Sequence, residues 1–292
     1  MSDSPAIDLL VTARSRDLGG FSVRRVLPTA QRRLIGPFIF YDHMGPATMP
    51  IGEGMDVRPH PHIALATVTY LFRGEIDHRD SLGSVKTIRP GDVNWMVAGR
   101  GIAHSERSSA ESRQAGVDIH GIQSWVALPI EHEEIEPRFE HHPGATIPRV
   151  ELPGVVLDVI AGTAYGARSP VGVLSPTLYV HAQLAAGARL HVEEEHEERA
   201  VYVVEGEIAL DEQTLVPGTL AVLRPGADVT LASGAGARIM LLGGQRLAGD
   251  RYIWWNFVSS SKERLERAKD DWKNDRFARV PGDSERIPLP ET

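Results

Sequence analysis

Residues 70–76 read YLFRGEI, and residues 202–208 read YVVEGEI. In both places a β-branched and aromatic run ends at Gly-Glu-Ile. After it come a hairpin, a Pro-Gly turn (residues 90–91 or 217–218) and a strand that ends at a glycine. The first match has an offset of 132 residues and the turns have an offset of 127, so the second hairpin is five residues shorter. Several matches in the same order are difficult to obtain by chance. They predict one fold that occurs twice in the chain.

The rest of the chain also has the pattern of an all-β protein. Short runs rich in β-branched and aromatic residues, separated by Gly, Pro, Asp and Asn about every ten residues, are typical of antiparallel barrels and sandwiches. One stretch, SSSKERLERAKDDW at residues 259–272, instead predicts a helix, with serines to cap it and Leu265, Ala268 and Trp272 on one face. We expect two β-barrels with a C-terminal helix and a Pro-rich tail that lies extended over the surface.

The polar, Pro-containing stretch EPRFEHHPGATIP at residues 136–148 is the predicted link between the two halves. It gives a first domain of residues 1–140 and a second domain of residues 141–292, the second including the helix and the tail. A chain of 292 residues is long enough for two such domains.

The composition is that of a globular protein, with 42% hydrophobic and 24% charged residues. No run of 18 or more apolar residues occurs, so no membrane span is expected. The N-terminal MSDSPAIDLLVTARSRD lacks the basic and apolar regions of a secretion signal, and cysteine is absent, which together favour the cytoplasm. The net charge of −8 is a poor match for phosphate groups, so we expect no direct nucleic-acid partner.

Two short stretches in the first half, RPHPH and GIAHSER, carry alternating ligand-type side chains. On a strand, residues i and i+2 point to the same face, so His60 projects with His62, and His104 projects with Glu106. If the two strands are neighbours in a small barrel, the two pairs converge. Three imidazoles and a carboxylate suit a divalent first-row metal such as Fe, Mn, Ni, Co or Zn, and they leave octahedral positions for other ligands.

The number of histidines has to be weighed against this interpretation. With 12 histidines in 292 residues, about half of one His-x-His pair is expected by chance, so that pair alone is weak support. A His-x-Glu pair in the same half of the repeat makes chance a much poorer explanation. The matching positions of the second half are Val192, Glu194, Leu231 and Ser233, so the set occurs once. His78, in the hairpin GEIDHRDSLG, is predicted to have a surface or turn role.

The sequence resembles the pirin family. The similarity lies in HPHIALATVTYLFRGEIDHRDSLG and IRPGDVNWMVAGRGIAHSER, and it continues in HEERAVYVVEGE and WWNFVSSSKERLERAKDDW. The resemblance implies a bicupin, which is a pair of cupin barrels with a metal in the first and a degenerate second barrel. It also implies that His60, His62, His104 and Glu106 are the metal ligands and that Fe(II) is the usual metal.

One departure from the family is visible at residues 63–66, where many pirins have Arg-Gly-Phe-Glu and this chain has Ile-Ala-Leu-Ala. The missing acid is not a ligand in the family, so we expect metal binding to survive. The surroundings of the metal change, and redox behaviour and substrate choice can change with them.

The resemblance implies two kinds of function. Some bacterial pirins resemble quercetin 2,3-dioxygenases, in which an aromatic flavonol and O₂ react at the metal and the ring opens with loss of carbon monoxide. Glu106 would then be catalytic, accepting the proton of the flavonol hydroxyl. Animal pirins instead resemble iron-dependent redox sensors that act on a protein partner without turnover. A metal-stabilised barrel with no turnover is the third alternative.

Overall fold

The structure is a computed structural model that describes residues 6–17 and 21–291, so the first five residues of the N-terminal stretch discussed above lie outside it. The described chain forms two compact units. The unit called here the first barrel contains residues 17, 21–23, 44–144 and 248–291. The second barrel contains residues 6–16, 24–43 and 145–247.

These units differ from the predicted domains of residues 1–140 and 141–292. The N-terminal segment belongs to the second barrel, and the C-terminal segment belongs to the first. Strand β1 (Ile7–Thr12) pairs antiparallel with β21 (Thr219–Leu223) and is an edge strand of the second barrel. Helix α2 (Lys262–Lys273) packs on the first barrel, where its buried face joins a cluster with Ile63 and Phe257. Pairing between segments so far apart in the chain leaves no mark on local sequence patterns.

The first barrel is built from a larger and a smaller antiparallel sheet. The larger sheet has the order β12 (Arg138–His142), β9 (Val93–Val97), β6 (Leu65–Arg73), β11 (Val117–Ala127), β4 (Phe38–Met49), β3 (Ser22–Leu27) and β2 (Arg14–Asp17). In its last three strands, residues 38–43, 24–27 and 14–16 are counted with the second barrel. The smaller has the order β5 (Asp56–His62), β10 (Ile102–Arg107), β7 (Ile76–Asp80) and β8 (Val85–Ile88). A helix α1 (Ala110–Ala115), a 3-10 turn (Ile130–His132) and the hairpin of β24 (Tyr252–Trp254) and β25 (Phe257–Ser259) complete this unit.

The second barrel has the same two-sheet construction. Its larger sheet has the order β1, β21, β18 (Glu198–Gly206), β23 (Ala237–Gly244), β16 (Thr177–Leu184), β14 (Val155–Ala164) and β13 (Arg149–Leu152), with β15 (Ala167–Arg168) paired to β14. Its smaller sheet has the order β17 (Arg189–Val192), β22 (Val229–Ala232), β19 (Ile208–Leu210) and β20 (Gln213–Leu215). A 3-10 turn (Gly144–Thr146) lies at the boundary of the units.

The strand orders of the two barrels correspond one to one. In the larger sheets β9-β6-β11-β4 matches β21-β18-β23-β16, and in the smaller sheets β5-β10-β7-β8 matches β17-β22-β19-β20. Strands β6 and β18 are the ones that carry the repeated Tyr and end at the repeated Gly-Glu-Ile. The predicted duplication and the predicted all-β class are therefore confirmed.

A glycine ends the repeated strand in both barrels for the same steric reason. Gly74 has φ of +83° and Gly206 has φ of +72°, a region that residues with a side chain rarely adopt. A Cβ atom added to Gly74 would lie 2.2 Å from the backbone oxygen of Asp118, and one added to Gly206 would lie 2.2 Å from the backbone oxygen of Gly236. The repeat thus preserves a position at which the backbone at the start of the neighbouring strand of the sheet lies too close for a side chain.

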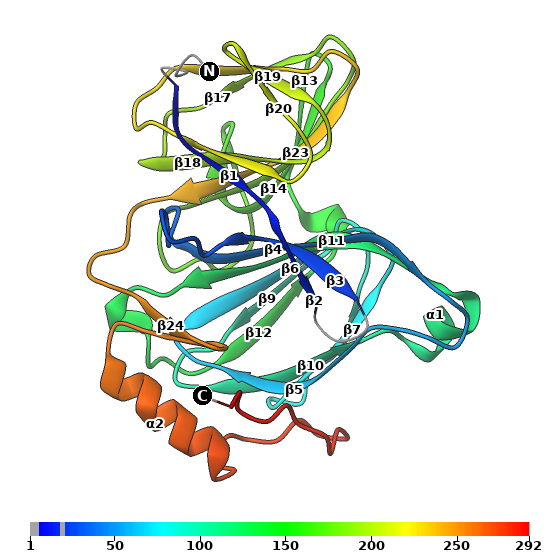
Figure 1. Cartoon of the computed structure of the whole chain (residues 1–292), viewed down its shortest axis with the longest axis vertical. Helices are drawn as coiled ribbons and strands as arrows, with labels where there is room; N and C mark the ends of the chain where they lie inside the picture. The colour runs from blue at the N-terminus through cyan, green and yellow to red at the C-terminus, as the bar shows by residue number, and fades with distance from the viewer. Residues whose placement is uncertain (1–5, 18–20, 292) are drawn as a thin grey trace. The chain divides into compact units, whose positions relative to one another are not determined.

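The predicted helix and tail are present at the C-terminal end. The hydroxyl of Ser261 caps α2 by accepting a hydrogen bond from the backbone N–H of Arg264, and Leu265, Ala268 and Trp272 form its buried face. The tail beyond α2 has no regular structure and is tied down at Ile287, whose N–H donates to the carbonyl of Pro59. Figure 1 shows α2, in orange, and the red tail beside β5 and β10. Among the described residues, no helix has the length and apolar character needed to cross a membrane.

We expect Gly74→Ala to lower the free energy of unfolding by about 2–4 kcal/mol, because it adds both an unfavourable φ and a clash with fixed backbone. Gly234→Ala is the matched control, since a Cβ at Gly234 would meet no atom within 4 Å. Chemical denaturation of the two variants checks the prediction. Equal stabilities would show that the strand end at Gly74 can move to accept a side chain.

Candidate metal centre

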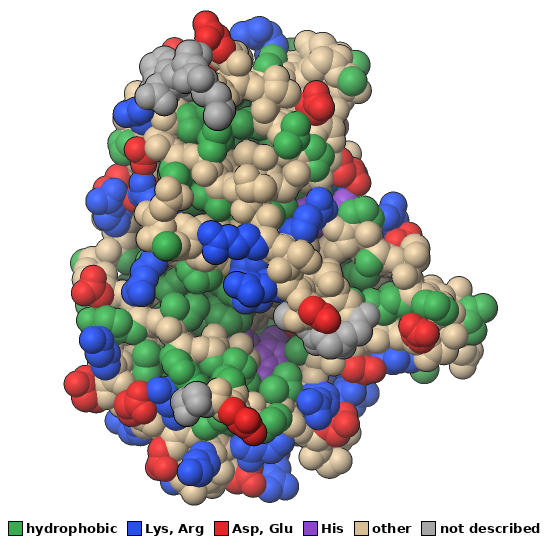
Figure 2. Space-filling model, in the orientation of Figure 1, with side chains coloured by type: hydrophobic (Ala, Val, Ile, Leu, Met, Phe, Trp, Pro, Cys, Tyr) green, Lys and Arg blue, Asp and Glu red, His purple; other side chains and the backbone are tan. Residues whose placement is uncertain are grey.

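Two neighbouring strands of the smaller sheet bring three histidines together in the first barrel. His60 and His62 are alternate residues of β5 and share a face, and His104 of β10 is the antiparallel pairing partner of His60. All three side chains are buried. Figure 2 shows histidine at the bottom of a surface hollow with hydrophobic side chains beside it. The sequence-based expectation that the two histidine-bearing stretches are neighbours is met by β5 and β10.

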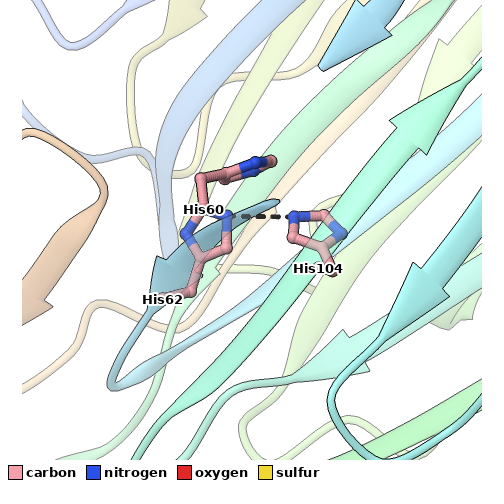
Figure 3. Close-up of side chains that lie close together, drawn as sticks. All are labelled: His60, His62 and His104. Atoms are coloured by element: carbon pink, nitrogen blue, oxygen red, sulfur yellow. Dashed lines mark hydrogen bonds between the residues drawn. The ribbon is translucent and has the colours of Figure 1, made fainter. Parts of the chain in front are cut away.

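The three imidazoles point toward one another (Figure 3). Their ring centroids are 4.4 to 5.0 Å apart, and one ligand nitrogen of each lies within 4.8 Å of those of the other two. The Nε2 atoms of His62 and His104 are 3.1 Å apart. Two nitrogen ligands at right angles about one ion, each about 2.1 Å from it, are about 3 Å apart. The spacing therefore fits adjacent ligands of a single metal ion.

Backbone carbonyls hold the Nδ1 atoms of the two histidines of β5, on the side of each ring away from Nε2. Nδ1 of His60 is 2.9 Å from the carbonyl oxygen of Arg58, and Nδ1 of His62 is 3.1 Å from that of Asn256. A carbonyl only accepts, so each Nδ1 carries the hydrogen and each Nε2 of the neutral ring has a free lone pair. This is the tautomer that a metal ligand requires, and it is the reason we conclude that these residues fit a metal ion.

Burial keeps the three rings neutral at physiological pH. It lowers the pKa of His60 to about 4. Burial also lowers the pKa of His62 and of His104, and the neighbouring His60 lowers both further. Protons therefore do not compete with a metal ion for the lone pairs until the solution is acidic.

Glu106, the fourth predicted ligand, is not in the group of three whose ligand atoms all lie within 4.8 Å of one another. It is buried and two residues from His104 on β10, but the β5–β10 register shifts between those two residues, so Glu106 pairs with Val57 across an irregularity. Its carboxylate accepts a hydrogen bond of 3.3 Å from the hydroxyl of Thr69. Burial raises its pKa. The structure thus brings three of the four predicted residues together, and ligation by Glu106 stays a prediction.

The predicted surface or turn role of His78 is wrong. The hairpin in which it lies contains strand β7, whose residues Ile76, His78 and Asp80 alternate into the interior. The ring of His78 stacks on that of Phe139 at 4.3 Å and lies next to His104, with the two Nδ1 atoms 3.4 Å apart. The alternation of an imidazole with a carboxylate two residues later is the sequence signal that could have found this residue.

Other neighbours of the site carry no sequence signal of their own. Thr69 on β6 and Gln123 on β11 are cross-strand partners and share a hydrogen bond of 2.7 Å beside Glu106. Trp125, also on β11, sets its ring edge-on against His62, with centroids 5.1 Å apart. These residues belong to the larger sheet, and only its packing against the smaller sheet brings them to the histidines.

The second barrel has buried apolar side chains at two of the four matching positions. Val192 and Leu231, which the sequence offsets align with His60 and His104, are buried in its hydrophobic core with about twenty other aliphatic residues. Within the part of the chain that the structure describes, the three histidines of the first barrel are the one group of three or more His, Asp or Glu side chains placed to hold a metal.

Comparison with known proteins gives the same architecture. Residues 20–126 match the Pirin family and residues 179–278 match the Pirin C-terminal cupin domain. A pirin-like protein of Caulobacter vibrioides is 50% identical over 98% of this chain and 100% of its own length. The chain belongs to the pirin family. This pirin is thus a protein of two cupin-type barrels, and its histidines lie in the first.

Two solved structures are similar to this pirin over nearly their whole length. A crystal structure of quercetin 2,3-dioxygenase from Acinetobacter baumannii has a TM-score of 0.90 and 34% identity, and the match covers 97% of this chain and 95% of that one. A second quercetin 2,3-dioxygenase structure from that organism has a TM-score of 0.87 and 28% identity, with 93% and 97% covered.

The depressed pKa of His60 predicts how the metal-free protein responds to acid. The unfolded chain binds a proton at this residue below about pH 6.5, whereas the folded protein does so only near pH 4, so stability is lost as the pH falls between these values. We expect His60→Gln to make this loss shallower by up to about 1.4 kcal/mol per pH unit.

Urea unfolding of the metal-free wild type and of His60→Gln at several pH values between 6.5 and 4.5 measures the two slopes. The comparison cancels the contribution of the carboxylates, which both proteins share. Equal slopes would mean that the folded protein takes up the proton at His60 as readily as the unfolded chain.

Proposed function

We propose that this pirin binds one divalent metal ion, most suitably Fe(II), through His60, His62, His104 and Glu106, and that it is a dioxygenase that opens the ring of a flavonol-type aromatic substrate. The observation that carries this proposal is the convergence of three buried, neutral imidazoles at the spacing of adjacent metal ligands. The likeness to quercetin 2,3-dioxygenase structures supports the substrate class.

When bound, the metal would supply the Lewis-acid and oxygen chemistry of the reaction. The chain supplies the ligands and their orientation, because the carbonyls of Arg58 and Asn256 direct two of the lone pairs inward. A surface hollow in which hydrophobic side chains lie beside histidine, such as the one in Figure 2, would suit an aromatic substrate.

Glu106 is the proposed acceptor of the proton that the flavonol hydroxyl loses. Burial raises its pKa, which makes the carboxylate a stronger base than an exposed glutamate. Its neighbours can accommodate both charge states. The ionised carboxylate accepts a hydrogen bond from the hydroxyl of Thr69, and after protonation it can donate to that oxygen while Thr69 donates to the side-chain oxygen of Gln123, 2.7 Å away.

We expect His62→Ala to remove bound metal and all oxygenase activity while the protein stays folded, because the variant loses a ligand that lies next to His104. Metal analysis, loss of quercetin absorbance and oxygen uptake measure the three quantities. His181→Ala is the control, since His181 is a buried histidine of the second barrel, paired with Asp158, and should leave metal content unchanged.

The outcomes separate the alternatives. Full metal content in His62→Ala would remove His62 from the ligand set. An iron-loaded wild type that consumes no flavonol would refute the dioxygenase and favour a redox-sensing protein that acts through a protein partner. Ring opening by the wild type, with release of carbon monoxide, is the result that we expect.

Glu106→Gln tests the proposed double role of the carboxylate. We expect weaker metal retention and, after reloading with excess metal, a turnover rate at least about 100-fold below that of the wild type, because the amide cannot accept the proton. Metal analysis before reloading and quercetin turnover after it measure the two roles separately. Unchanged metal retention would exclude ligation, and unchanged turnover would exclude the base role.

A further inference from the structure

Two polar side chains of β7 lie buried behind the metal ligand of β10. His78 is 3% exposed and Asp80 is 0% exposed, and β7 pairs with β10 so that Asp80 is the cross-strand partner of His104. Buried charged and polar groups are costly unless their partners are in place. Their position therefore calls for a reason beyond the packing of the barrel.

The contacts form an unbroken chain from a carboxylate to the ligand. Oδ2 of Asp80 is 3.0 Å from Nε2 of His78, and Nδ1 of His78 is 3.4 Å from Nδ1 of His104. The other oxygen, Oδ1, accepts hydrogen bonds of 2.9 and 3.0 Å from the backbone N–H groups of Leu82 and Ser84. Both oxygens of Asp80 are thus occupied, and the remaining ring nitrogen of His78 faces His104.

With Asp80 ionised and the imidazoles neutral, one arrangement of hydrogens satisfies this chain. Oδ1 of Asp80 accepts from two backbone N–H groups and Oδ2 faces a ring nitrogen of His78, which is the setting of an ionised carboxylate. An ionised carboxylate only accepts, so Nε2 of His78 donates and Nδ1 of His78 is left as an acceptor. Nδ1 of His104 must then carry its hydrogen, and Nε2 of His104 is left with a lone pair.

We propose that Asp80 and His78 are positioning residues that fix the tautomer of His104 and so keep its Nε2 lone pair directed at the metal. The inference rests on the proposed metal site. His104 differs here from the other two histidines. Backbone carbonyls set the tautomers of His60 and His62, and substitution cannot remove them, whereas the tautomer of His104 depends on two side chains.

The stacking of His78 on Phe139 makes this device rigid. The two rings are nearly parallel, at 9° between planes and 4.3 Å between centroids. Phe139 lies on β12 and pairs with Met96 of β9, so the ring that orients His104 is itself held by the larger sheet. A ring clamped on its face by an aromatic side chain and at its edge by a carboxylate has little freedom to rotate.

Asp80→Asn is the sharpest test, because the chain of hydrogen bonds can then reverse. The amide oxygen is expected to keep the backbone N–H groups of Leu82 and Ser84, which turns the amide N–H toward Nε2 of His78. That nitrogen becomes an acceptor, Nδ1 of His78 donates to His104, and the hydrogen of His104 moves to Nε2, where it blocks the metal. The replacement of one oxygen of residue 80 by nitrogen is thus expected to switch the tautomer of His104, which residue 80 reaches through the ring of His78.

Long-range ¹H–¹⁵N NMR of metal-free protein with labelled histidine reads the tautomer directly. We expect the hydrogen of His104 on Nδ1 in the wild type and on Nε2 in Asp80→Asn. Asp158→Asn is the matched control, because Asp158 is likewise buried and paired with a buried histidine, His181, but lies in the second barrel. It should leave the signals of His104 unchanged. An Nδ1 hydrogen retained by His104 in Asp80→Asn would overturn the inference.

Zn(II) titration against a competing chelator measures the consequence for affinity. We expect the dissociation constant to rise about 10- to 100-fold in Asp80→Asn and to stay unchanged in Asp158→Asn. Should Asp80→Asn fail to fold, His78→Phe keeps the stacking on Phe139 but removes the acceptor, and it should also weaken Zn(II) binding about 10-fold.

The failures of the two proposals are distinguishable. A wild type that does not bind Zn(II) would overturn the metal site, and the positioning role would fall with it. A wild type that binds Zn(II), with folded Asp80→Asn and His78→Phe of equal affinity, would overturn the positioning role alone.

Discussion

The antiparallel pairing of β5 with β10 is the constraint on which the site depends. It sets His60 directly opposite His104, and the alternation of side chains along β5 then adds His62 to the same face. Because that alternation has a period of two, a slip of one residue would turn a strand's histidines to the other face of the sheet. The metal centre is therefore as well defined as the register, which is regular from Ile102 to His104 and shifts between His104 and Glu106.

Burial then decides the chemistry of the groups gathered there. The same loss of water lowers the pKa of the histidines and raises the pKa of Glu106, since in each case it disfavours the charged form. The result is a set of neutral nitrogen donors beside a carboxylate with increased basicity. Such an interior is stable only if the remaining polar atoms have partners, and the backbone carbonyls, Thr69 and the pair of His78 and Asp80 provide them.

One of these partners comes from the far end of the chain. The carbonyl of Asn256, which accepts from His62, lies between β24 and β25. This hairpin is held to the first barrel by the buried ion pair of Arg251 with Glu133, whose carboxylate also accepts from the hydroxyl of Ser259. The C-terminal segment is thus part of the metal site as well as of the fold.

The second barrel has kept the turns and glycines that its backbone requires and has filled its interior with aliphatic side chains.

The sequence by itself determined the duplication, the all-β class, helix α2 and the alternating ligand pairs, because each of these is written in local patterns of side chains and turns. It did not determine the register shift between β5 and β10 beside Glu106, the inward position of His78, or the exchange of the chain ends between the barrels. These depend on which distant strands pair and where the pairing is irregular. Such choices are made by packing and by long-range hydrogen bonds, so they were decided only in the tertiary structure.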